Sequence, residues 1–181
     1  MESTRRYTGT AITLHWLIAA LIVAAFWLGW VMSDMPGLTP TKLKYFSWHK
    51  WLGVTIFMLA VLRLAWRSFN PAPPHLTSIP HWQQRAASAM HVILYLLIFV
   101  IPATGYLYSL AAGVPVVYLG LFPLPVLFEK NQLLKEVFGD LHTILNYSMA
   151  GLVAIHAGAA LKHHFIDRDA TLARMLPFLR G

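Results

Sequence analysis

Four long apolar runs constrain what this chain can fold into more than any other feature of its sequence. They cover about residues 11–32, 46–66, 86–110 and 138–165 of a 181-residue chain. A helix needs about 20 apolar residues to cross the hydrocarbon core of a bilayer, so each run is long enough to form one span. Together they use most of the chain and leave little for a water-soluble domain. The sequence therefore predicts one transmembrane domain over residues 1–181, an all-α four-helix transmembrane bundle in a lipid bilayer.

The composition supports this class and excludes several others. Charged residues make up 12% of the chain, about half of their share in a soluble domain. The chain has no cysteine, which excludes disulfides, cysteine-ligated iron–sulfur clusters and covalent c-type haem attachment. The formal net charge of +7 would suggest nucleic acid in a soluble protein, but in a membrane protein it reports topology. We therefore expect no nucleic-acid partner.

Three details of the apolar segments need interpretation. The first run is too long for the h-region of a signal peptide and lacks a clear small-residue cleavage site, so it is expected to remain as a span. The third run contains Pro102, which a membrane bundle tolerates and which predicts a kink. Residues 116–128 are apolar but short and contain Pro123 and Pro125, so they are expected to form an interfacial or re-entrant loop.

The distribution of positive charge predicts the orientation of the bundle. Four acids partly offset the five lysines on one face. The other nine of the fourteen Lys and Arg residues gather at the two termini and around the connection between the second and third spans: Arg5, Arg6, Arg63, Arg67, Arg85, Lys162, Arg168, Arg174 and Arg180. Because positive residues accumulate on the cytoplasmic side, both termini are expected to be cytoplasmic.

Histidines within the apolar spans carry the functional information. There are five among the nine in the chain: His15, His49, His91, His142 and His156. An ionisable group in a membrane span is costly and is by default a functional hypothesis. A single such histidine is explained equally well as a neutral imidazole hydrogen-bonded between helices, so the set matters more than any member.

The spacing of two of these histidines predicts how they pair. His142 and His156 are 14 residues apart on one predicted helix. Fourteen residues return an α-helix to within about 40° of the same face, about 21 Å further along the axis. One face thus presents His142 near the periplasmic side and His156 nearer the cytoplasm. His49 lies at the first depth and His15 at the second, which predicts the pairs His49 with His142 and His15 with His156.

Two facing imidazoles at one depth form an axial pair for a haem iron inserted into an apolar bundle. Zinc is the competing interpretation, but it usually takes three or four protein ligands, and neither layer offers a cysteine or an obvious carboxylate. A non-redox metal or proton transporter is a further alternative. Haem iron is therefore the expected metal. Two bis-histidine haems stacked across a membrane suit electron transfer.

Other residues near these layers have two interpretations each. Gly53, one turn after His49, either lets a porphyrin approach or makes a helix–helix contact. Arg63, at the cytoplasmic end of the same face, either pairs with a haem propionate or snorkels to the interface. His91 competes with His15 as partner of His156 and ranks second, as a propionate contact or a core hydrogen bond.

A quinone site is expected beside the cytoplasmic pair. His163 follows His156 by seven residues, on nearly the same face and about 10 Å closer to the cytoplasm. That position suits a quinone headgroup, and Thr13, two residues before His15, offers a hydroxyl to the same pocket. The alternative is that His163 and His164 form only an interfacial polar cap.

These residues resemble the bacterial cytochrome b561 family, which is similar to the di-haem cytochrome b subunits of nickel-iron hydrogenases and formate dehydrogenases. The resemblance runs essentially end to end. Its recognisable pieces are Leu14-His15-Trp16-Leu17, Trp48-His49-Lys50-Trp51-Leu52-Gly53, Met90-His91-Val92-Ile93-Leu94-Tyr95, Leu141-His142, His156-Ala157-Gly158, Lys162-His163-His164-Phe165 and the tail from Asp167 to Met175.

The resemblance implies two non-covalent b-type haems, ligated by histidines on the first, second and fourth spans in the pairing already derived. It also implies a multi-pass protein of the bacterial inner membrane that exchanges electrons with ubiquinone near the cytoplasmic haem. In some members of the family, periplasmic superoxide is the electron donor.

The expected function is therefore electron transfer between a periplasmic-side donor and ubiquinone, with a superoxide:ubiquinone oxidoreductase as the expected enzyme. Lys50, beside His49, and Lys42 and Lys44 upstream offer positive charge that would steer superoxide. The alternative is a haem-containing relay or anchor subunit for a dehydrogenase or a periplasmic donor protein, which would dock on residues 116–128.

Overall fold

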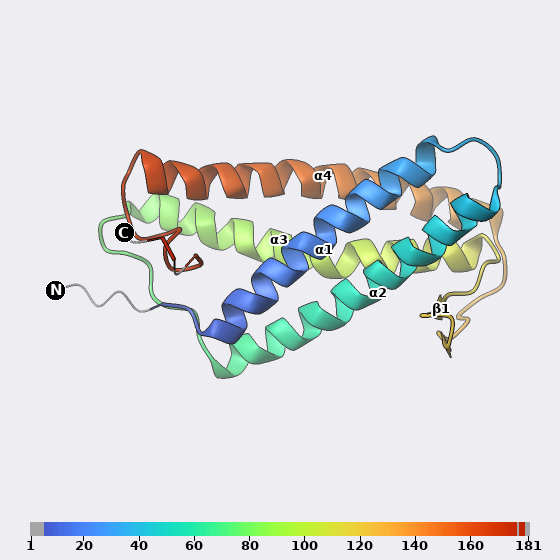
Figure 1. The fold of residues 1–181 in the computed structure, drawn as a ribbon, viewed down its shortest axis with the longest axis horizontal. Helices are drawn as coiled ribbons and strands as arrows, with labels where there is room; N and C mark the ends of the chain where they lie inside the picture. The colour runs from blue at the N-terminus through green and yellow to red at the C-terminus, as the bar shows by residue number, and fades with distance from the viewer. Residues whose placement is uncertain (1–5, 177, 180–181) are drawn as a thin grey trace.

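The computed structural model describes residues 6–176 and 178–179, which form four long helices and one short hairpin (Figure 1). The elements are α1 (Gly9–Asp34), α2 (Pro40–Phe69), α3 (His81–Ala111), β1 (Val117–Tyr118), β2 (Phe122–Pro123) and α4 (Gln132–Phe165). All four helices are long and apolar enough to cross a membrane. The chain is therefore an all-α four-helix bundle, which confirms the predicted fold class.

Side-chain caps set where three of the helices begin. Thr8, Thr39 and Asn131 each accept a hydrogen bond from the backbone amide three residues later. Pro40 occupies the first helical position of α2, where a missing N–H is not needed. Because these caps lie outside the apolar runs, α2 and α4 each begin six residues before the run that predicts them.

The helices pack as two antiparallel pairs. α3 packs along α4, and α1 packs along α2, while α2 also contacts α3 (Figure 1). Within the described residues, α4 has no packing of comparable extent with α1 or α2. Large apolar side chains cover the outside of the bundle: Val23, Leu96 and Ile155 are 64%, 60% and 61% exposed. Such a surface suits a bundle surrounded by lipid.

The third helix continues through Pro102, which lies inside α3. Ile101, the preceding residue, uses its carbonyl to accept a hydrogen bond from the Thr104 hydroxyl at 2.8 Å. The helix is therefore not interrupted at the proline, and the kink expected there stays a prediction.

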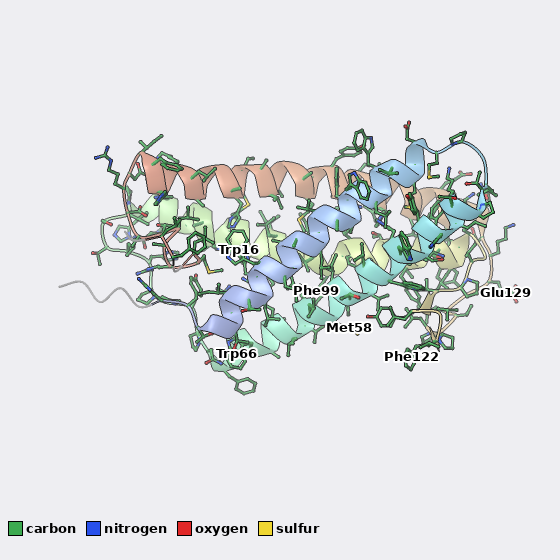
Figure 2. All side chains as sticks on the ribbon, viewed as in Figure 1. Trp16, Met58, Trp66, Phe99, Phe122 and Glu129 are labelled. Atoms are coloured by element: carbon green, nitrogen blue, oxygen red, sulfur yellow. The ribbon has the colours of Figure 1, made fainter. Side chains whose placement is uncertain are left out.

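A hairpin closes one end of the bundle, where residues 116–128 were expected to form a loop. The Trp51 indole donates to the carbonyl of Val117 at 2.8 Å, and the hydroxyls of Thr55 and Tyr118 lie 3.0 Å apart. Figure 2 shows Phe122 at this end, away from Trp16. Within the described part of the chain no fifth helix is long enough to span a membrane, so this segment is a loop tied to α2.

The chain after α4, residues 166–176, closes the opposite end and is called the C-terminal segment below (Figure 1). The Trp16 indole donates to the carbonyl of Met175 at 2.9 Å. The Arg174 guanidinium donates from Nη1 to the carbonyl of Pro74 at 2.7 Å. These two bonds tie the C-terminal segment to α1 and to the connection between α2 and α3.

Candidate functional site

Four histidines meet as two pairs across the bundle. His49 on α2 faces His142 on α4, with ring centres 6.1 Å apart, and His15 on α1 faces His156 on α4, with ring centres 6.3 Å apart. The first, near the hairpin, is called the hairpin pair below, and the second, near the C-terminal segment, the terminal pair. The structure thus brings together the residues that the 14-residue spacing predicts to be partners.

Both separations fit two imidazoles that share one metal ion. A ligating histidine nitrogen lies about 2 Å from its metal and the ring centre about 1 Å beyond it, so two opposed rings have centres about 6 Å apart. Each pair joins α4 to a helix with which it does not pack closely. A Cβ added at Gly53 on α2, one turn after His49, would meet no atom within 4 Å. The donor sets of both pairs, and the open space at Gly53 beside the hairpin pair, fit a planar haem.

His49 is fixed in place by the neighbouring helix α1. Its Nδ1 donates to the backbone carbonyl of Ala25 at 3.0 Å. The ring lies against Gly29, where an added Cβ would come within 3.2 Å of its Cε1. The carbonyl and the glycine are four residues apart, so they lie on one face of α1. Gly29 leaves the space into which the imidazole fits.

His142 is held in the same way by α3. Its Nδ1 donates to the carbonyl of Ile101 at 3.0 Å, and an added Cβ at Gly105 would lie 2.9 Å from its Cε1. The spacing from carbonyl to glycine is again four residues. Thr104, 4% exposed, bonds to the same carbonyl. Because Nδ1 carries the proton in both rings, Nε2 of His49 and of His142 has its lone pair available for a metal.

The terminal pair belongs to a group of three rings. His91 on α3 lies closer to His156 than His15 does, with ring centres 5.3 Å apart against 6.3 Å. That separation is shorter than the value of about 6 Å for two opposed axial rings, so His15 fits the ligand role better. Within the described residues, none of the three rings has a hydrogen bond to a backbone carbonyl like those of the hairpin pair.

Arg63 lies beside this group without an acidic partner. Its charge is close enough to act on His15, His91 and His156. Its Nε donates to the Tyr95 hydroxyl at 2.8 Å. The ion pairs among the described residues lie on the C-terminal side of α4 and do not include Arg63. A half-buried guanidinium of this kind suits an anionic group such as a carboxylate.

His163 and Thr13, the residues predicted to line a quinone site, have different surroundings. His163 lies near the end of α4, and its Nδ1 is 2.7 Å from a carboxylate oxygen of Asp169. Thr13 is exposed on α1, and in the described part of the chain it makes no hydrogen bond with His163. The structure therefore gives His163 a polar partner that the sequence analysis did not identify, and does not join Thr13 to it.

Three further residues escaped the sequence analysis. Gly29 and Gly105 sit in apolar runs and carry no motif of their own, although each lies four residues after the carbonyl that a histidine needs. Arg174 appeared only as a cytoplasmic charge. In the structure it is 9% exposed, and its Nε is buried without a hydrogen-bond partner. A buried cation whose recorded hydrogen bond is to a neutral carbonyl is unusual and marks this end of the bundle as polar inside.

Comparison with known proteins gives one consistent result. The model of the prokaryotic cytochrome b561 family matches residues 6–178. Cytochrome b561 homolog 2 of Escherichia coli (strain K12) is 37% identical over 175 residues, covering 97% of this chain and 93% of the relative. Cytochrome b561 homolog 1 of the same strain is 33% identical, covering 95% and 97%. The probable superoxide oxidase CybB of Yersinia pestis is 28% identical, covering 98% and 99%.

Replacing Gly105 by alanine should displace the His142 ring, because the new Cβ would lie 2.9 Å from Cε1. Overpacking of this kind costs about 1–3 kcal/mol, so the variant should unfold at a lower temperature in detergent. The matched control, Gly9→Ala, meets no atom within 4 Å and should leave the unfolding midpoint unchanged or slightly higher. Equal midpoints for Gly105→Ala and the wild type would contradict the packing described here.

Proposed function

The chain belongs to the prokaryotic cytochrome b561 family of membrane electron-transfer proteins, and from this premise we propose that it holds two b-type haems and carries electrons across the bacterial inner membrane. His49 and His142 would hold one haem, and His15 and His156 would hold the other. A haem held by two imidazoles would supply one-electron transfer at each pair.

The two matched histidine pairs support this proposal most directly. Their ring separations of 6.1 and 6.3 Å suit a shared metal, and the pairs lie toward opposite ends of the bundle. Arg63 offers its guanidinium to a propionate at the terminal pair. We take the end that carries the C-terminal segment as cytoplasmic, because nine of the fourteen positive residues were assigned to that face.

The purified protein should contain two haems per chain, measured as pyridine haemochrome against protein mass. His142→Ala should lose the haem at the hairpin pair and retain the other, and His156→Ala should do the reverse. His91→Ala should retain both, because its ring separation fits the ligand role less well. A ratio of one haem per wild-type chain, or loss of both haems from either alanine variant, would contradict two independent pairs.

Ubiquinone is the proposed acceptor at the terminal pair. His163 lies seven residues beyond His156 on α4 and is only 16% exposed at its side chain. An imidazole at this depth can donate a hydrogen bond to a quinone carbonyl while the isoprenoid tail of the quinone lies in the lipid. Ubiquinone becomes ubiquinol by taking up two electrons and two protons, so a site near cytoplasmic water also meets the need for protons.

His163→Ala should slow reoxidation of the reduced protein by short-chain ubiquinone by about 100-fold, the usual contribution of a positioned proton donor. Stopped-flow absorbance of the haem bands measures this rate. His164→Ala, at the neighbouring position, is the control and should stay within about twofold of the wild type. If His163→Ala reoxidises at the wild-type rate, the quinone lies elsewhere.

Superoxide is the proposed electron donor at the hairpin end. One relative of the chain carries the name probable superoxide oxidase, which supports this choice of donor. Each superoxide gives up one electron and leaves as dioxygen, so two superoxide ions supply the electrons for one ubiquinol. Lys42, Lys44 and Lys50 lie on the first half of α2, the half that carries His49. Their positive charge would raise the rate at which a small anion arrives.

Superoxide should reduce the haems rapidly, at a rate that falls several-fold as ionic strength rises from about 0.01 M to 0.15 M. Lys50→Glu should slow the reduction, whereas Arg85→Glu, exposed near the start of α3 at the opposite end of the bundle, is the charge-matched control and should have less effect. The measurement is haem reduction by a superoxide-generating system, with superoxide dismutase as the blank.

A relay subunit is the second candidate, and the exposed apolar hairpin favours it. Leu121, Phe122 and Leu127 are 73%, 61% and 61% exposed at the hairpin end, and Figure 2 shows Phe122 at its margin. A docked partner would cover these side chains and deliver electrons in place of superoxide. Absence of haem reduction by superoxide, with intact haem content, would support this function instead.

A further inference from the structure

The chain turns back on itself directly after α4 and brings a carboxylate to His163. α4 ends at Phe165, and Arg168 then adopts a left-handed backbone conformation with φ of 53°. A residue other than glycine in this region costs about 1 kcal/mol or more. The amide of Asp169 donates to the carbonyl of His163 at 3.1 Å, which completes the turn. The turn brings the Asp169 carboxylate to the His163 ring, and the hydrogen bonds that form there offset its local cost.

Asp169 and His163 form a well-shielded hydrogen-bonded pair. Nδ1 of His163 lies 2.7 Å from Oδ2 of Asp169, and the two side chains are 16% and 13% exposed. The other carboxylate oxygen, Oδ1, accepts the backbone amide of Thr171 at 2.8 Å. Both oxygens of Asp169 are therefore engaged, and the carboxylate has a fixed orientation toward the imidazole.

Asp167 is also near His163 but has a different partner. Its Oδ2 lies 3.2 Å from Nδ1 of His163 and 2.6 Å from Nζ of Lys162, and its side chain is 31% exposed. The charge of Asp167 is thus balanced by Lys162 in a solvent-accessible ion pair. Asp169, which is more shielded and closer, is the carboxylate that fixes the orientation of the His163 ring.

Asp169 is ionised at neutral pH. Partial burial acts to raise the pKa of its carboxyl, but hydrogen bonding from Thr171 and from His163 outweighs burial and holds the pKa below its usual value. A carboxylate at Nδ1 keeps a proton on that nitrogen, so Nε2 is the nitrogen through which His163 reaches another group.

We propose that His163 is the proton donor for quinone reduction at the terminal pair and that Asp169 is the residue that positions it. This inference rests on the proposed ubiquinone site and adds the source of one proton. His163 gives a proton through Nε2 to one carbonyl oxygen of ubiquinone as the quinone is reduced. The second proton, for the other oxygen, comes from water. The two electrons come from the donor, and a haem held at the terminal pair would pass them on one at a time to complete the conversion to ubiquinol. His163 then regains its proton from cytoplasmic water.

The same three side chains offer an alternative ligand set. One ligand atom each from His163, Asp167 and Asp169 can be chosen so that all lie within 4.8 Å of one another. Lys162 already occupies Asp167 with two contacts, at 2.8 and 2.6 Å, and a cation would have to displace it. A proton-donating histidine needs no such displacement, which is why the arrangement favours it over a metal site.

The test compares Asp169→Asn, Asp169→Glu and the matched control Asp167→Asn in the purified protein. Three quantities are measured for each: haem content, the affinity of the oxidised protein for short-chain ubiquinone by calorimetry, and the maximal rate of reoxidation in H2O and D2O. Asp169→Asn should keep both haems and bind quinone within about twofold of the wild type. Its maximal reoxidation rate should fall at least tenfold, with a larger solvent isotope effect.

Asp169→Glu should recover much of the lost rate, because it restores the carboxylate, and Asp167→Asn should stay within about twofold of the wild type. Weaker quinone binding with an unchanged maximal rate in Asp169→Asn would overturn the proposal, because the residue would then only shape the site. Loss of haem from both Asp169 variants would also overturn it, by assigning Asp169 a structural role. A wild-type rate abolished by a chelator would assign the cluster to a metal.

Failure of this inference is distinguishable from failure of the quinone site. If His163→Ala is slow but Asp169→Asn is normal, the quinone site stands and the role of Asp169 is wrong. If both variants reoxidise and bind quinone like the wild type, the proposed site itself is wrong.

Discussion

Two imidazoles must face each other at the same depth of the bundle, twice, and the rest of the structure depends on this constraint. One helix, α4, supplies a ring to each pair, so its partners must approach it from α2 at one end and α1 at the other. The histidine rings of each pair reach across a gap between α4 and the partner helix, α2 or α1, because the backbones of these helices do not pack closely. The close packing occurs instead between α1 and α2 and between α3 and α4. The bundle is thus held together by helix pairs that leave the histidine-bearing faces free.

The two ends of the bundle solve different physical problems. At the hairpin end each imidazole donates to a backbone carbonyl and fits over a glycine of the adjacent helix, which fixes both rings before anything binds between them. At the terminal end three rings, an arginine and a buried Arg174 share a polar interior with few fixed hydrogen bonds. A rigid site suits repeated exchange of electrons with little rearrangement, whereas a polar site suits chemistry that also moves protons.

Periodicity explains how far sequence reasoning reached. The four apolar runs predicted the bundle, and the 14 residues between His142 and His156 predicted which histidines meet, because a helix of known pitch fixes both face and depth. The glycines under the rings were not predictable in this way, since their role depends on which face of a neighbouring helix turns inward. The contact between His163 and Asp169 was also missed, because it requires the left-handed turn at Arg168, and no repeat in the sequence marks such a turn.

The C-terminal segment has a consequence for how the protein is assembled. Its bonds from Met175 to the Trp16 indole and from Arg174 to the Pro74 carbonyl join residues separated by 159 and 100 positions. Both contacts join segments that are far apart in the sequence, so this end of the bundle is complete only when α1, the connection between α2 and α3, and the C-terminal segment are all in place. The His49 and His142 rings are instead fixed by carbonyls of α1 and α3. The two ends can therefore loosen separately, and disturbing the C-terminal segment should open the terminal pair before the hairpin pair.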